Sequence, residues 1–247
     1  MNSGRSCILT YHSVDATESV ISVCPRVFRD QMNWLAESGT RVVPLSEIRS
    51  TPGSVALTFD DGFQNFFEQA LPVLQEHRFP ATVFVVSGYC GGANNWPSQP
   101  ARPPVPQLNL MGWNEVEQAA QAGISVGAHT VTHPFLSRLS HAEVEEELRT
   151  SCAAIEDRTG RSVTTFAYPY GDSSAEVRQA AARHFSLACG TRLAFVSSDS
   201  DSMELPRLDV FYLQRRFWFQ GLRTEYGAAY LAARRSLRSL RRWGGPQ

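Results

Sequence analysis

Two adjacent carboxylates are the first residues in this sequence with an evident capacity for chemistry. Asp60 and Asp61 follow the apolar run Val55–Phe59 and precede Gly62, which lets the chain turn. Neighbouring side chains point to opposite faces within a strand, but at its carboxyl end the backbone turns, so both can reach one cleft. The alternative is an ordinary Asp-Asp-Gly turn at the protein surface.

Two histidines form a second group with metal-binding potential. His129 and His133 come just after another expected strand, Ile124–Ala128. Histidines four residues apart point the same way on one helical turn, as in other paired-histidine metal sites, although a pair at this spacing also arises by chance. Because the histidines and the carboxylates both follow strands, and two imidazoles with one carboxylate make a three-ligand site with open positions, we predict a metal site there.

The elements that would position these residues alternate between short apolar runs and amphipathic helical patterns, which predicts parallel βα units. Strands are expected at Cys7–Tyr11, Val55–Phe59, Ala81–Val86, Ile124–Ala128, Thr165–Ala167 and Ser186–Ala188. Helices are expected from Pro25 to a stop at Gly39, at about Asn65–Glu76, at Asn114–Ala122 and at His141–Thr159. At 247 residues the chain suits one large α/β domain better than two.

Two segments depart from this alternation. Gly91–Leu110 is rich in Gly, Pro and Asn and contains Trp96, and so long a loop is typical of a binding or lid element. Beyond residue 213 the chain carries eight arginines against the single acid Glu225. We therefore divide the chain into a domain of residues 1–213 and an Arg-rich helical tail of residues 214–247.

The tail has a narrow apolar stripe on a helical template, which consists of Tyr230, Ala233, Leu237 and Leu240. We favour a terminal helix that packs this stripe on the domain and leaves its arginines in solvent. The alternatives are a helix that lies on an anionic membrane surface or one that grips an acidic partner.

Bulk properties exclude several classes of function. The formal net charge is −1, so the whole chain gives no reason to expect a nucleic-acid partner. All 23 basic residues are arginine, which excludes a lysine Schiff base and a phosphate-loop lysine. The beginning lacks the apolar stretch of a secretory signal and no run is long enough to span a membrane, so we expect a cytoplasmic protein, with the inner face of the membrane as an alternative location for its tail.

The two motifs also carry a family resemblance. Thr58-Phe59-Asp60-Asp61-Gly62 and His129-Thr-x-x-His133-Pro134 resemble the first two motifs of the polysaccharide deacetylases, carbohydrate esterase family 4 or the NodB homology domain. The resemblance spans roughly residues 5–212 and includes Leu110–Trp113 and Phe166–Gly171. It implies a single-domain irregular (β/α)7 barrel in which Asp61, His129 and His133 bind a divalent metal and Asp60 is the general base.

The chain departs from the usual pattern of this family at two places. Members usually carry an arginine beside the base in their third motif, where this sequence has Ala167, and a Leu-x-His motif near the carboxyl end, which is missing here. Ile8-Leu9-Thr10-Tyr11-His12-Ser13 is instead similar to a permuted branch, which implies His12 as the general acid. Arg207 is the candidate replacement for the missing arginine. The alternative for His12 is a histidine satisfied by hydrogen bonds in the core, and the alternative for Arg207 is an ion pair at the surface.

Together these observations predict a metal-dependent hydrolase that removes N-acetyl groups from an amino sugar, an oligosaccharide or a polysaccharide. Tyr168, Tyr170 and Trp96 are candidates to offer flat faces to sugar rings, unless they serve packing. We expect Zn²⁺ as the metal, with Co²⁺, Ni²⁺ or Mn²⁺ as alternatives. The alternative functions are hydrolysis of another amide or ester, such as a small cyclic amide or a natural-product acyl group, and glycan binding by a catalytically inactive barrel.

Overall fold

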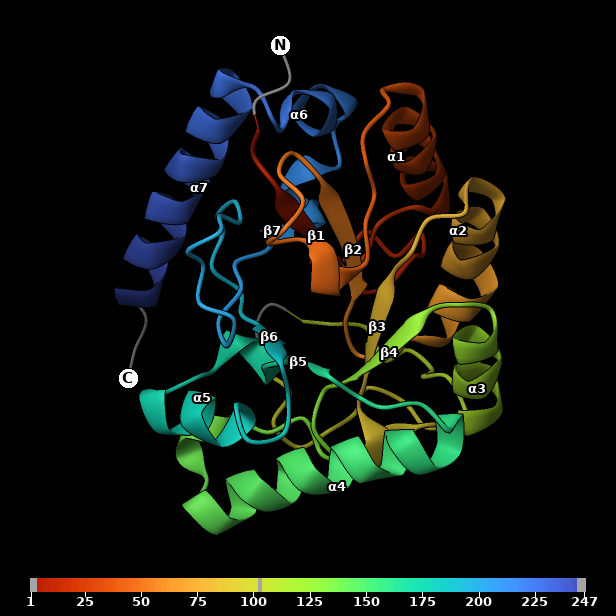
Figure 1. The fold of residues 1–247 in the computed structure, drawn as a ribbon, viewed down its shortest axis with the longest axis vertical. Helices are drawn as coiled ribbons and strands as arrows, with labels where there is room; N and C mark the ends of the chain where they lie inside the picture. Colours follow the sequence, from red (N-terminus) through yellow and green to blue (C-terminus); the bar gives the residue numbers. More distant parts are fainter. Residues whose placement is uncertain (1–3, 102–103, 244–247) are drawn as a thin grey trace.

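One curled parallel sheet forms the centre of the protein (Figure 1). The computed structural model describes residues 4–101 and 104–243, with side chains up to Leu237. In that part of the chain the sheet has seven strands in the order β6-β5-β4-β3-β2-β1-β7. They are β1 (Cys7–Tyr11), β2 (Val55–Phe59), β3 (Thr82–Val85), β4 (Ser125–Ala128), β5 (Thr165–Ala167), β6 (Leu187–Cys189) and β7 (Leu208–Asp209).

Helices and short helical turns connect these strands around the outside of the sheet (Figure 1). The α-helices are α1 (Pro25–Glu37), α2 (Leu71–His77), α3 (Trp113–Gln121), α4 (His141–Thr159), α5 (Ala175–Ala181), α6 (Arg216–Gly221) and α7 (Glu225–Trp243). The single turns are η1 (Leu45–Glu47), η2 (Phe66–Ala70), η3 (Ser87–Tyr89), η4 (Leu136–Arg138), η5 (Pro169–Gly171) and η6 (Val210–Leu213).

The sheet curls because its two end strands approach each other. Leu205, just before β7, pairs in parallel with Cys189 of β6. Its N–H donates to the Ala188 carbonyl (2.8 Å), and its carbonyl accepts from Gly190 (2.9 Å). This contact draws the sheet into an irregular barrel and confirms the predicted (β/α)7 fold class.

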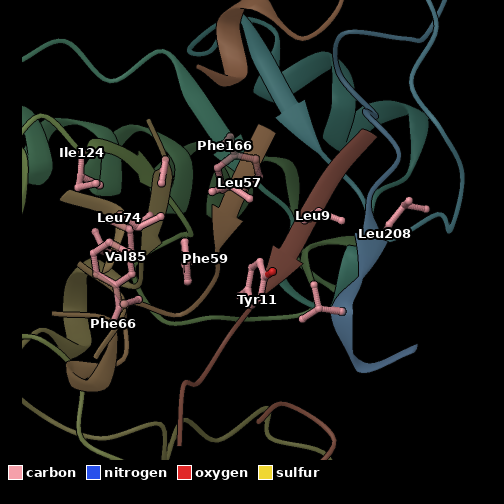
Figure 2. Close-up of a cluster of buried hydrophobic side chains, with 14 of the residues drawn as sticks. Leu9, Tyr11, Leu57, Phe59, Phe66, Leu74, Val85, Ile124, Phe166 and Leu208 are labelled. Carbon is pink, nitrogen blue, oxygen red and sulfur yellow. The ribbon is translucent and has the colours of Figure 1, made fainter. Parts of the chain in front are cut away.

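Alternate residues of each strand face two different cores, as strand geometry requires. The outward core packs against the helices and includes Leu9, Tyr11, Leu57 and Phe59 (Figure 2). The inward core fills the barrel and is built from the intervening positions, which are Ile8, Ala56, Phe84, Ala167 and Cys189. Whether a side chain points into the barrel or toward the helices therefore depends on its place in the two-residue alternation of the strand.

Most of the predicted elements are confirmed to within one or two residues, but three differences have physical causes. The expected helix at 65–76 begins as the π-helical turn η2, next to Pro72, which has no N–H to complete a regular turn. The two-residue strand β7 is too short to leave a pattern in the sequence. The expected helical tail of residues 214–247 is divided into the short helix α6 and the longer helix α7.

The tail is helical as expected, but the packed face of its helix differs from the predicted stripe at Ala233 and Leu237. Among the described side chains of α7, Leu231 is the buried large hydrophobic one and Tyr230 is half-buried against the core, whereas Ala233 and Leu237 are exposed. The Leu240 side chain and residues 244–247 lie outside the described residues. Leu231 belongs to the same hydrophobic core as the strands, so this core continues from the barrel into the tail. The division of the chain at residue 213 stays a prediction.

None of the described helices has the length and apolar character needed to cross a membrane.

Candidate functional site

The alternation of inward and outward side chains along the strands brings three candidate side chains to the mouth of the barrel, at the carboxyl ends of the strands. His12 continues the inward series of Ile8 on β1, and Asp60 continues that of Ala56 on β2. The two segments are adjacent because β1 pairs with β2 in parallel and the N–H of Asp60 donates to the Tyr11 carbonyl (3.0 Å). His129 follows β4 and lies at the same edge of the sheet. The carboxyl ends of these strands thus form one site.

Asp61 reaches the same mouth through an unusual backbone conformation. Its φ is +69°, and Gly62 follows at +74°. A non-glycine residue in this left-handed region is uncommon and often marks a functional site. The turn brings Asp61 Oδ1 to 3.4 Å from His129 Nε2 and 3.3 Å from His133 Nε2. Both neighbouring carboxylates face one site, as expected, because the left-handed backbone at Asp61 and Gly62 reverses the direction of the chain.

Asp61, His129 and His133 have the geometry of metal ligands. The two imidazole Nε2 atoms are 3.2 Å apart, which completes a nearly equilateral triangle with Asp61 Oδ1. Tetrahedral ligand atoms at about 2.1 Å from one ion would be about 3.4 Å apart. All three residues are buried, and together they offer a carboxylate oxygen and two ring nitrogens. The residues therefore fit a divalent metal.

The histidine ligands do not lie on a helical turn, so that part of the prediction is wrong. Thr130 has a φ of +67° and His133 a φ of +56°, and the segment is an irregular turn. Glu147 of α4 holds this turn: one carboxylate oxygen accepts from the N–H groups of Val131 (2.7 Å) and Thr132 (3.0 Å). The other oxygen accepts from the Thr132 hydroxyl (2.6 Å). Tertiary contacts orient the ligands here instead of helical periodicity.

Each histidine is also fixed on the side away from the metal position. His129 Nδ1 lies 2.7 Å from the Ala167 carbonyl, so Nδ1 can donate to this acceptor while Nε2 binds a metal. The His133 ring lies between Trp96 (ring centroids 4.3 Å apart) and Tyr170 (4.6 Å). Its Nδ1 has no hydrogen-bond partner among the residues described in the structure.

Asp60 lies beside the metal-binding group but has different partners. The Arg207 guanidinium donates to both carboxylate oxygens, with both distances 2.7 Å. Arg207 is itself buried and donates through Nε to the Gly190 carbonyl (2.9 Å). It therefore reaches Asp60 from the segment before β7, so the pair is a buried bidentate ion pair and not a surface one.

The two carboxylates remain ionised for different reasons. Burial raises the pKa of Asp60, but the charge and hydrogen bonds of Arg207 outweigh it, and the net pKa lies below its usual value. Burial also raises the pKa of Asp61, and here the hydrogen bonds from His129 and His133 reverse the shift. Both side chains are thus charged at neutral pH, one as part of an ion pair and the other as a ligand.

His12 lies on the open side of this group. Its Nε2 is 3.9 Å from Asp60 Oδ2, and the side chain is 26% exposed. Asn65 holds the following backbone in place: it donates to the Ser13 hydroxyl (2.6 Å) and accepts from the Val14 N–H (3.0 Å). His12 therefore has access to both Asp60 and solvent, which a satisfied core histidine would lack.

The three aromatic candidates occupy different positions. Tyr168 is buried, and its hydroxyl donates to the Met203 carbonyl (2.9 Å), so its ring does not face the mouth. Trp96 is also buried, stacks on His133 and donates to the Tyr170 hydroxyl (3.1 Å). Tyr170 is half-buried and stays a candidate for substrate contact. Trp96 of the long loop thus supports the candidate metal ligand His133, and its ring is not available as a flat face for a sugar.

Sequence reasoning missed two residues that position the site. Glu147 is one of four glutamates within five residues near the start of α4, where an acidic residue has an ordinary explanation in the helix dipole. Asn65 lies four residues after Asp61, and nothing in its spacing indicates a contact with Ser13. Only their contacts in the structure distinguish them from neighbouring polar residues.

Comparisons with known proteins agree with this geometry. Residues 48–185 match the family described as polysaccharide deacetylase. A chitooligosaccharide deacetylase from Bradyrhizobium sp. is 37% identical over 123 residues, which cover 47% of this chain and 48% of that protein. A poly-β-1,6-N-acetyl-D-glucosamine N-deacetylase from Staphylococcus aureus is 25% identical over 167 residues, 61% of this chain and 54% of that protein. The chain thus spans about half the length of these two relatives.

A solved structure extends the comparison to the fold. IcaB from Ammonifex degensii superposes with a TM-score of 0.74 at 23% sequence identity, covering 91% of this chain and 98% of that chain. This likeness shows the shared irregular barrel.

Proposed function

The chain belongs to the polysaccharide deacetylase family, and on this premise we propose that it is a metal-dependent N-deacetylase of acetylated amino-sugar glycans. One observation carries the proposal: the two adjacent carboxylates have separate partners. Asp61 converges with two imidazoles, while Asp60 is held by Arg207 and faces His12. Metal-assisted amide hydrolysis uses a metal site, a base and an acid at one place, and this division provides candidates for all three.

Asp61, His129 and His133 would hold the metal, and Zn²⁺ is the ion we propose. A carboxylate oxygen and two imidazole nitrogens at nearly tetrahedral separations suit Zn²⁺, although Co²⁺, Ni²⁺ and Mn²⁺ accept the same donors. When bound, the metal lowers the pKa of water and polarises an acyl oxygen. Measurement of metal content in the purified protein, followed by exchange of each ion, tests this choice.

Asp60 would act as the general base. Its carboxylate is ionised, and its neighbour Asp61 is engaged by the histidines, so Asp60 is the carboxylate free to accept a proton from the attacking water. Arg207 fixes the plane of this carboxylate through its two hydrogen bonds. A backbone N–H near Tyr170 would donate to the oxyanion that develops on the acyl group.

His12 would act as the general acid. An amine leaves poorly as an anion, so the reaction needs a proton donor close to the scissile nitrogen. His12 lies across from Asp60 at 3.9 Å and is partly exposed, so it can recover a proton from solvent after each turnover. Asn65 and Ser13 hold the segment that carries it.

The two relatives support the substrate class, because one is named as a deacetylase of chitooligosaccharides and the other as an N-deacetylase of poly-β-1,6-N-acetyl-D-glucosamine. The test is acetate release from N-acetylated chito-oligosaccharides and from β-1,6-linked N-acetylglucosamine oligomers, with Asp60→Asn as the inactive control. Release from either series supports the proposal. Turnover of simple amides or esters without release from these glycans would identify a different acyl hydrolase, and no turnover by metal-loaded protein would favour a binding role.

A further inference from the structure

The C-terminal elements carry a surface that the proposed chemistry does not use. Four of the five exposed large hydrophobic residues in the described part of the chain lie on η6, α6 and α7: Phe211, Phe217, Tyr226 and Leu237. Phe217 is 61% exposed, the highest value among them. We call the surface formed by Phe211, Arg215, Arg216, Phe217, Tyr226 and Arg234 the aromatic–arginine face. A concentration of exposed rings on one part of a molecule marks an interaction surface.

The rings on this surface are held in place by contacts between neighbouring elements. Phe217 of α6 stacks on Tyr226 of α7, with ring centroids 5.3 Å apart. Beside this pair, Trp218 stacks on Tyr230 at 3.9 Å. Figure 1 shows α6 and α7 as neighbours at one edge of the molecule. The exposed rings are therefore part of a fixed arrangement and not the ends of loose segments.

A hollow lies next to these stacked pairs. It has a volume of about 360 Å³ and is lined by Phe211, Tyr212, Gln214, Arg215, Trp218, Tyr230 and Arg234. Arg234 is held over the rings of Tyr230 and Tyr212, with Cζ 5.3 and 5.6 Å from their centroids. Two guanidinium groups beside aromatic walls suit a phosphate whose substituents are partly apolar.

Positive charge predominates in this region. Four arginines are exposed here, namely Arg215, Arg216, Arg234 and Arg235. The sequence has two acids from residue 209 onward: the Asp209 carboxylate accepts from the Phe211 N–H at 3.0 Å, and Arg5 binds the Glu225 carboxylate at 2.8 Å. The surface thus offers positive charge together with apolar rings. A soluble polyanion would satisfy the charge but would leave the exposed rings in water.

We propose that the aromatic–arginine face docks on an anionic phospholipid bilayer. Phe211, Phe217 and Tyr226 would enter the interface at headgroup level, where aromatic rings are favoured. Arg215, Arg216 and Arg234 would contact lipid phosphates. None of these residues contributes to the metal-binding mouth, so the docking surface and the proposed active site are separate parts of the protein.

The test is co-sedimentation of the full chain with vesicles of phosphatidylcholine that contain phosphatidylglycerol, compared with vesicles of phosphatidylcholine alone. We expect binding to the anionic vesicles that weakens with salt. Arg215→Gln with Arg234→Gln should lower the partition coefficient roughly 30-fold, as expected for two cationic groups at an anionic surface. Phe217→Ser should lower it roughly tenfold through loss of apolar burial.

Matched substitutions elsewhere serve as controls. Arg29→Gln with Arg149→Gln removes the same charge from exposed positions on α1 and α4, and Val20→Ser removes an exposed apolar side chain from a different segment. These variants should bind vesicles nearly as the unaltered protein does. Every variant should keep its thermal unfolding temperature and its acetate release from soluble oligosaccharides, which separates docking from folding and from catalysis.

Three outcomes would overturn the proposal. The first is no binding of the unaltered protein to anionic vesicles. The second is equal loss of binding in the face variants and in the matched controls, or loss in neither. The third is binding to soluble polyglutamate as tight as binding to vesicles, with Phe217→Ser changing neither, which would identify an acidic polymer as the partner.

Discussion

The mouth of the barrel has two halves that use adjacent residues for different tasks. In the metal-binding half, Asp61 meets two imidazoles, and in the proton-transfer half, Asp60 meets Arg207 and faces His12. Both carboxylates are buried, and the backbone turn at Asp61 gives them different partners. A carboxylate next to two imidazole nitrogens can bind a metal cation together with them. A carboxylate that is paired with a guanidinium stays outside the metal-binding group and can accept a proton.

Substitution of each carboxylate should separate the two halves most strongly. We expect Asp60→Asn to retain metal and to lower kcat for acetate release by about 100- to 10,000-fold, the range for loss of a general base. Asp61→Asn should lose the metal, because an amide oxygen is a weaker ligand than a carboxylate. Metal content and acetate release, measured on both variants, check this. If Asp60→Asn lost the metal and Asp61→Asn kept it, the two roles would be exchanged.

Removal of the Arg207 guanidinium should lower the stability of the fold and should also leave the Asp60 carboxylate without its ion-pair partner. Arg207→Met leaves the Asp60 carboxylate buried without its cation, at an expected cost of about 3–5 kcal/mol in the free energy of unfolding. Urea unfolding of this variant and of the pair Arg207→Met with Asp60→Asn measures the effect. Because the second substitution removes the unpaired charge, it should restore part of the stability. Purely additive losses would mean that Arg207 contributes by packing and not by pairing.

Substitution of His12 should affect only substrates that need a proton on the leaving group. We expect His12→Asn to lower kcat for N-acetylated sugars about 100-fold. Hydrolysis of 4-nitrophenyl acetate should change little, because nitrophenolate leaves without protonation. Parallel assays of both substrates provide the measurement. An equal loss on both would indicate a structural role for His12, and near-full activity on the amide would remove His12 from the mechanism.

The smallest expected effect concerns the support of the metal-binding half. Glu147→Gln keeps an oxygen for the histidine turn but loses a charge-assisted hydrogen bond, and we expect metal affinity to fall roughly tenfold. Glu146→Gln is the matched control, because this neighbour bonds to Arg149 and Thr150 at the surface. Competition with a chelator measures both affinities. A similar change in the two variants would mean that the turn does not depend on Glu147.

Local sequence patterns determined the strands and the residues that end them. The inward and outward alternation of Ile8, Leu9 and their neighbours follows from the two-residue period of a strand, so it needs no tertiary information. The same period carries Asp60 and His129 to the edge of the sheet. The metal-binding half was therefore predictable, because its ligands lie in two short motifs directly after strands.

Only the tertiary structure decided the partners of those residues. Arg207 lies 147 positions from Asp60, and their contact depends on the curl that brings the segment before β7 back to the barrel interior. The turn that joins the two histidines is set by Glu147 of α4 and by left-handed backbone at Thr130 and His133, in place of the helical turn that the spacing favoured. Residue spacing records neighbours along the chain, whereas a buried ion pair or a strained turn is stabilised by groups that meet only after the sheet has closed.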